Sequence, residues 1–243
     1  MATPVAAVAT TKPANRFRFR VTFNFVMALL IAAVVIWGFS RTIGARLIHP
    51  RSPPPTLLYI HAAVFASWVL LFITQTALVA TRNVRVHRKL GVLGLALGVS
   101  IPILGVATAM VMGRLPGHHD DNGAAFLAIT LFDMIAFTIP FGLAAYWRGK
   151  PEFHRRLMLI ATCALTSAAI GRLIPSSWPD GWIYVGVDAL IFLGVGRDLM
   201  ITRRLHAVYR YGIPALLVGQ TIAMYLDVSR SPQWIAIAHQ LIG

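Results

Sequence analysis

Four ionisable side chains lie within long apolar stretches of the sequence: His61, Asp133, Arg172 and Asp188. Ionisable groups inside a membrane are costly unless they are paired or hydrated, so each of them needs a functional or structural reason. A neutral imidazole with two carboxylates suits Zn²⁺ or Fe²⁺, which makes His61, Asp133 and Asp188 candidate metal ligands. The same residue types suit a proton relay, because histidine titrates near neutral pH.

The alternative interpretation of these four residues is structural. An ion pair between Arg172 and either Asp188 or Asp133 would only fix the register of two helices. If Arg172 instead lies beside the site, its charge disfavours a bound cation and favours an anionic ligand. The residue types leave these alternatives open.

His61 begins a stripe at three- and four-residue steps that continues through Phe65, Trp68, Phe72 and Gln75. This spacing places the five side chains on one face of a helix. A face with polar ends and large aromatics between them suits the interior of a bundle, and it adds Trp68 to the predicted site. Packing alone would also explain the aromatic residues.

The sequence HHDD, which includes His118 and His119, follows a predicted span. These two histidines are weaker candidate metal ligands, placed above the site by the loop that carries them. Loop residues of this kind are also commonly just hydrated.

A second pair of histidines, His87 and His154, occurs in the related segments VHRKLG (86–91) and FHRRLM (153–158). Membrane cytochromes b hold haem with histidine pairs on facing helices, so His87 and His154 are candidate haem b ligands. The surrounding cations favour a different role at the level of the lipid headgroups, where basic side chains reach phosphate.

The composition predicts the elements that must position these residues. The chain has 243 residues, of which 57% are hydrophobic and only 12% charged, whereas soluble domains carry about 25% charged residues. Apolar runs of roughly 20 residues span a bilayer as helices. We therefore expect an all-α integral membrane protein, a bundle of seven transmembrane helices at 21–39, 56–80, 90–112, 124–147, 156–176, 182–202 and 209–227.

Charge predicts the orientation of these spans. With the N-terminus inside, most of the 22 lysines and arginines fall in inside segments, which the positive-inside rule favours. Seven spans then place the C-terminus outside. The predicted organisation is a disordered basic cytoplasmic tail (1–20), a seven-helix transmembrane domain (21–227) and a short external segment (228–243) that lies in the interface or packs on the bundle.

The net charge of +14 does not indicate nucleic-acid binding, because the cations lie in short loops between spans. Their expected partners are the bilayer and the anionic lipid headgroups of the cytoplasmic face. The single cysteine, Cys163, excludes an intrachain disulfide and a cysteine-based metal site. No nucleotide-binding glycine motif is present.

Four glycines follow one face of the third predicted span, and small residues at such spacing let two helices approach closely. The partner is either a second copy, which would make a homo-oligomer, or a neighbouring helix of the same chain. These glycines are Gly91, Gly94, Gly98 and Gly105.

At HRKLG (87–91) and HRRLM (154–158) the chain resembles uncharacterised multi-pass bacterial membrane proteins with an HRRLG or HRRLML signature after a cytoplasmic loop. The resemblance covers the second to fifth spans loosely and implies a membrane location without an activity. The layout is also similar to that of the seven-helix membrane hydrolases that include alkaline ceramidases and adiponectin receptors. Those proteins hold zinc with several histidines, including a pair on the last span, whereas 209–227 here contains none.

These observations predict a polytopic protein of a bacterial-type inner membrane with an outward-facing His/Asp/Arg site that binds or translocates a small ligand, ion or proton. Two alternatives remain: a metal-dependent membrane hydrolase or haem b redox protein, and a structural membrane subunit without chemistry.

Overall fold

The computed structural model describes residues 22–50, 53–115, 120–175, 177–179 and 181–243. All regular secondary structure in these ranges is helical, as predicted. In chain order the elements are α1 (Phe23–Ser40), the π-helical turn η1 (Gly44–Ile48), α2 (Thr56–Ala80), α3 (Val84–Gly113), α4 (Asp121–Tyr146), α5 (Pro151–Ala164), α6 (Ser167–Gly171), α7 (Trp182–Thr202), α8 (Ala207–Ser229) and α9 (Pro232–Ile242).

Five of these helices, α1, α2, α3, α4 and α8, are long and apolar enough to cross a membrane. Large apolar side chains also point away from the bundle, among them Met200, which is 84% exposed, and Val92, which is 74% exposed. Soluble monomers rarely expose contiguous apolar surface on this scale. The chain is therefore an all-helical protein with the composition and surface of a membrane protein.

The predicted segment 156–176 differs most from the structure. It is not one regular helix, because the α-helical hydrogen-bond pattern is interrupted at Leu165 and Thr166, although both keep right-handed helical dihedral angles, and resumes as α6. The backbone amide and the side-chain hydroxyl of Thr166 both donate to the carbonyl of Cys163 (2.9 and 2.6 Å). Such side-chain bonds compete with the regular helical pattern. The segment predicted at 90–112 begins earlier, at Val84. The basic residues Arg85, Arg88 and Lys89, predicted to precede the span, therefore lie within the helix.

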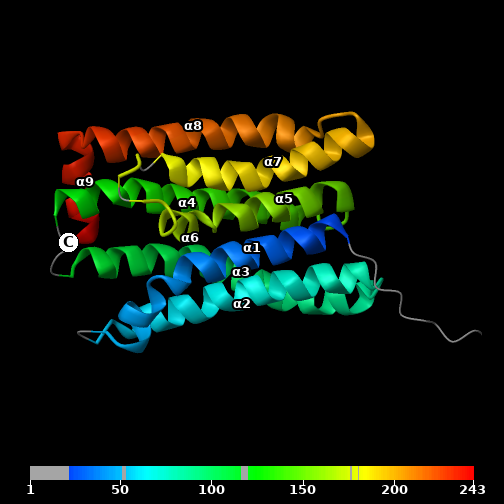
Figure 1. Ribbon diagram of the computed structural model, residues 1–243, viewed down its shortest axis with the longest axis horizontal. Helices are drawn as coiled ribbons and strands as arrows, with labels where there is room; N and C mark the ends of the chain where they lie inside the picture. The colour runs from blue at the N-terminus through cyan, green and yellow to red at the C-terminus, as the bar shows by residue number, and fades with distance from the viewer. Residues whose placement is uncertain (1–21, 51–52, 116–119, 176, 180) are drawn as a thin grey trace, which may run out of the picture.

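The long helices lie side by side along the longest axis of the molecule (Figure 1). The connections 81–83, 147–150 and 203–206 lie together at one end, which we call the basic end because the cations of the segments around them gather there. The opposite end carries η1, the end of α3 and α9.

Helix α4 is the most buried of the five candidate spans and contacts α3, α5, α8 and α9. The glycine face of α3 packs against it: a Cβ at Gly98 would overlap the ring of Phe141, and a Cβ at Gly105 would overlap the sulfur of Met134. Two of the four predicted glycines thus serve contact within the chain. Gly38 has a similar role, because α1 touches the backbone of Ala169 in α6 at that point.

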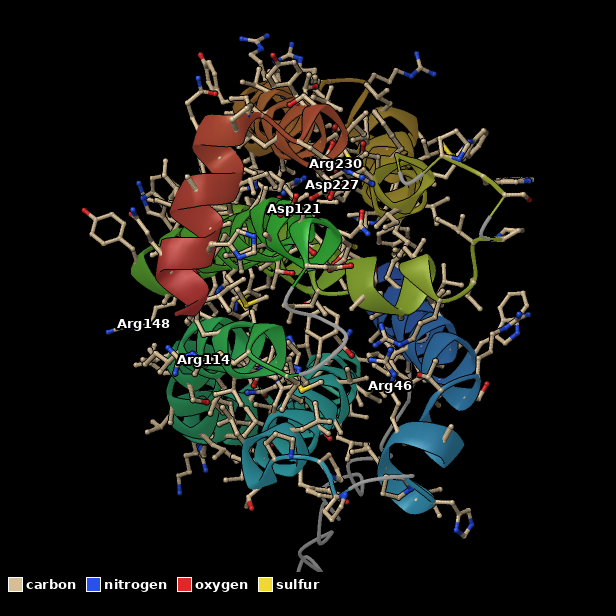
Figure 2. The ribbon with its side chains drawn as sticks, turned by 90° about the vertical axis from the view of Figure 1, so that its left-hand side faces the viewer. Arg46, Arg114, Asp121, Arg148, Asp227 and Arg230 are labelled. Atoms are coloured by element: carbon tan, nitrogen blue, oxygen red, sulfur yellow. The ribbon has the colours of Figure 1, made fainter. Side chains whose placement is uncertain are left out.

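The segment after α8 forms the amphipathic helix α9 and packs on the bundle, which was one of its two expected placements. Its indole at Trp234 donates from Nε1 to the carbonyl of Ala125 in α4 (3.2 Å). Its last turn accepts a hydrogen bond from Arg114 at the carbonyl of Ile242. Figure 2 looks onto this end and shows Arg114 close to the C-terminal end of α9.

Candidate functional site

Asp133 lies in the middle of α4 and is only 8% exposed. Its Oδ2 accepts a hydrogen bond from the hydroxyl of Ser167 in α6 (2.5 Å), and its Oδ1 accepts one from the hydroxyl of Tyr184 in α7 (3.3 Å). Both donors are neutral. Within the described residues no arginine, lysine or histidine forms an ion pair with this carboxyl group.

The interruption between α5 and α6 positions the first of these donors. Ser167 is the first residue of α6, is 4% exposed, and faces α4. Sequence reasoning did not single out Ser167, because a serine within an apolar run gives no signal of its orientation. The break at Thr166 is what determines that orientation, and hydropathy does not record it.

Asp188 lies one turn after Tyr184 in α7 and is half-buried. Gln220 of α8 donates to it from Nε2 to Oδ1 (2.9 Å). The Tyr184 hydroxyl lies within electrostatic range of Asp133, Asp188 and Asp227. We call Asp133, Ser167, Tyr184, Asp188 and Gln220 the outer carboxyl cluster, after the side on which the topology predicted from the sequence places it.

The outer carboxyl cluster borders the surface of the bundle. An open groove runs between α7 and α8, and its lining includes Tyr184 and Gln220 together with the apolar side chains of Leu217 and Met224. Two of the five residues of the cluster, Tyr184 and Gln220, therefore line this groove.

His61 belongs to a separate group between α2 and α3. Its ring stacks on Phe65 (4.1 Å between ring centroids) and lies against the backbone of Leu104. Trp68 packs edge-on against Phe137 (5.3 Å), and the face of α2 predicted to point inward does so. His61 Nδ1 and Trp68 Nε1 are buried and have no hydrogen-bond partner among the described residues.

Arg172 turns toward α1 and away from the aspartates. Its Nε donates to the hydroxyl of Thr42 (3.1 Å), its Nη1 donates to the carbonyl of Ala168, and its guanidinium lies 4.4 Å from the ring centre of Phe39. It lies within electrostatic range of His61. In the described part of the chain it forms no ion pair with Asp133 or Asp188, so the expected structural ion pair is not formed.

The structure thus divides the predicted site in two. Asp133 is hydrogen-bonded to Tyr184, which lies within electrostatic range of Asp188. His61 instead lies between α2 and α3, and Arg172 contacts Thr42 and Phe39. Trp68 packs on Phe137 of α4 and forms no hydrogen bond with either aspartate in the described part of the chain. Over the described ranges no three His, Cys, Asp or Glu residues come close enough to hold a metal ion, so His61, Asp133 and Asp188 do not form one ligand set. The weaker candidates His118 and His119 lie outside the described residues.

At the basic end, Arg156 of α5 and Asp198 of α7 form a buried ion pair with two hydrogen bonds (2.5 and 2.9 Å). Their side chains are 4% and 2% exposed, and Arg156 also binds Glu152 (2.6 Å). From the sequence, Arg156 counts only as one of the inside cations. The signal was available, because Glu152 and Asp198 are the acidic residues among the many cations of this end.

The alternative haem ligands His87 and His154 also lie together at the basic end, with 6.4 Å between ring centroids. His206 lies nearby, against Phe153 (4.8 Å between ring centroids), and caps α8 by accepting a hydrogen bond at Nδ1 from the amide of Val208 (3.2 Å). Burial lowers the pKa of the His206 imidazole, and the charge of Arg156 lowers it further.

Comparison of the chain with family models, with curated proteins and with solved structures gave no match. The class of protein therefore rests on the fold and composition: an all-helical protein with five candidate membrane-spanning helices and buried polar groups at both ends of the bundle.

Proposed function

We propose that the chain is a seven-span protein of a bacterial-type inner membrane, with the N-terminus inside and the C-terminus outside. The α5–α6 pair and α7 complete the count of seven beside the five candidate spans. The grouping of the cations at one end supports the orientation, because positive residues remain on the cytoplasmic side. The basic end then meets anionic lipid headgroups, and the outer carboxyl cluster lies in the outer half.

We further propose that this protein binds a small cation, in the simplest case a proton, at the outer carboxyl cluster. The observation that carries the proposal is the environment of Asp133: a buried carboxyl group whose two hydrogen-bond donors are the neutral hydroxyls of Ser167 and Tyr184. A charge buried without a partner of opposite charge is strongly unfavourable. A bound proton or a small cation removes that cost.

The surroundings favour a cation over an anion. Tyr184 lies within electrostatic range of three carboxyl groups, whereas Arg172, the intramembrane arginine, is directed at Thr42 and Phe39. The groove beside Tyr184 and Gln220 supplies the access route. His61 is not part of this cation site, because it lies between α2 and α3.

Modification with dicyclohexylcarbodiimide tests the proposal. The hydroxyl of a protonated carboxylic acid adds across one carbon–nitrogen double bond of this apolar reagent, and the product rearranges to a stable acylurea. No atom is lost, so the mass of the modified residue rises by the full mass of the reagent. In membranes containing the full chain we expect an adduct at Asp133 by mass spectrometry, with less adduct at alkaline pH or with added sodium. Asp133→Asn should remove this adduct.

The matched control is Asp121→Asn, which changes an exposed aspartate in the first turn of the same helix and should leave the Asp133 adduct intact. Modification of other carboxyl groups with none at Asp133 at any pH would contradict the proposal. A structural subunit would show the same adduct at every pH and sodium concentration.

A further inference from the structure

Two imidazoles from different helices meet at the basic end. His87 comes from the first turns of α3 and His154 from the first turn of α5, and their ring centroids are 6.4 Å apart with the planes at 81°. The pair shares no residue with the outer carboxyl cluster and lies at the other end of the bundle. A role for it is therefore independent of the proposed function.

The hydrogen bond of His154 fixes which of its nitrogens is free. Its Nδ1 lies 2.9 Å from the carbonyl oxygen of Ala144. A carbonyl oxygen can only accept, so Nδ1 carries the hydrogen and Nε2 keeps a lone pair. Histidines that bind metals usually donate their other ring N–H to a carbonyl or carboxylate in this way, which sets the tautomer and the direction of the ring.

Two further polar atoms beside the pair lack partners. His87 Nδ1 and the Oε1 atom of Gln75 in α2 are buried, and neither has a hydrogen-bond partner among the described residues. Gln75 is held in place by its Nε2, which donates to the backbone carbonyl of His87 (3.2 Å). Buried polar atoms are nearly always bonded, so an unpartnered nitrogen and an unpartnered oxygen on two residues joined by a hydrogen bond indicate a missing partner.

We propose that His87 and His154 bind one transition-metal ion at the basic end, with the side-chain oxygen of Gln75 beside it as a third donor. Metal–nitrogen bonds to imidazole are about 2 Å long, so two ligating rings have centroids about 5–6 Å apart. The observed 6.4 Å reaches that range with a small rotation of either side chain. The ion is then bound by residues from the N-terminal turns of α3 and α5 and from the C-terminal part of α2.

The donor set defines the class of metal. Imidazole nitrogens suit zinc, copper, nickel and iron, whereas Mg²⁺ and Ca²⁺ require oxygen ligands and, in most sites, carboxylates. Iron supplied as haem would use the same two nitrogens, so the experiment must separate a free ion from haem.

The test is metal binding by the full chain, purified with an affinity tag that contains no histidine. With Zn²⁺ and Cu²⁺ as probes, we expect about one ion per chain, and binding at least about 10-fold weaker in His87→Ala and in His154→Ala. His61→Ala and His206→Ala are matched controls that should bind as the unmodified chain does. Absence of binding, or equal binding by all variants, would overturn the site.

A second measurement needs no variant and so does not depend on the folding of one. Electron paramagnetic resonance of the Cu²⁺-loaded unmodified chain should show hyperfine coupling to two imidazole nitrogens, and coupling to fewer would overturn the proposal. The absorption spectrum then identifies the source. A haem absorption band that either alanine variant removes assigns the pair to haem iron, and its absence with bound ion assigns it to a free metal.

Discussion

Asp133 and Asp198 are both buried aspartates that tie helices together, yet they are compensated in different ways. Asp198 receives the guanidinium of Arg156 through two hydrogen bonds, at the basic end. Asp133 receives two neutral hydroxyls, from Ser167 and Tyr184. A carboxylate paired with arginine is a fixed structural tie, because its charge is already neutralised. A carboxyl group with only neutral donors has no fixed positive charge beside it, so the proton or small cation that we propose to neutralise it can exchange.

The comparison first requires that the basic end, which holds Asp198, lies on the cytoplasmic side of the membrane. Gly44 and Gly149 offer a matched pair of positions, because a Cβ at either would meet open space. In a Cys163→Ala background, we expect an impermeant thiol reagent added outside intact cells to label Gly44→Cys and not Gly149→Cys. Labelling of both or the reverse pattern would refute the proposed orientation.

Breaking the basic-end pair should have the largest effect on stability. Asp198→Ala leaves the buried guanidinium of Arg156 with only Glu152, and we expect a loss of about 3 kcal/mol in the free energy of unfolding. Denaturant unfolding in detergent measures this loss. Arg204→Ala, at an exposed position of the same end, is the control and should stay within about 0.5 kcal/mol. Equal losses would show that the pair is not a structural tie.

Removing the acceptor at Asp133 should cost less. Asp133→Leu leaves the hydroxyls of Ser167 and Tyr184 without their acceptor, which we expect to destabilise the fold by about 2 kcal/mol. Asp133→Asn keeps a carbonyl acceptor and should cost less than about 1 kcal/mol. The difference between the two variants in the same unfolding assay separates hydrogen bonding from charge. If Asp133→Asn lost as much free energy of unfolding as Asp198→Ala, the two aspartates would not differ in their structural role.

The smallest effect is expected at the half-buried edge of the outer cluster. Gln220 lines the groove, and Gln220→Ala removes its hydrogen bond to Asp188, which water can replace. We expect a loss of about 0.5–1 kcal/mol. Thr221→Ala, the next residue in α8, is an exposed comparison. A much larger loss would place Asp188 in the structural core of the bundle.

The helical architecture could be predicted from the sequence because long apolar runs and basic loops each have one physical explanation in a membrane protein. The break at Thr166 could not, because it depends on a side-chain hydroxyl competing for the carbonyl of Cys163. That break determines where Ser167 and Arg172 point. Sequence could therefore identify the ionisable residues of the site without identifying their partners.

The basic end shows the same limit. The sequence predicts that the cations there lie at the membrane surface, but helix packing withdraws Arg156 into a buried pair. The close approach of His87 to His154 also depends on how α3 and α5 each pack against α4. Rotations of helices about their axes are set by packing, and periodicity within one helix constrains them only in part.

Infrared difference spectroscopy tests the central contrast most directly. Spectra of the full chain recorded across a pH range should contain, beside the bands of the other carboxyl groups, a carbonyl stretch of the protonated Asp133 side chain that appears as the pH falls. We predict that Asp133→Asn removes this band and that Asp198→Asn leaves it unchanged, because the carboxylate of Asp198 is neutralised by Arg156. A band that survives in Asp133→Asn, or that disappears in Asp198→Asn instead, would contradict the account.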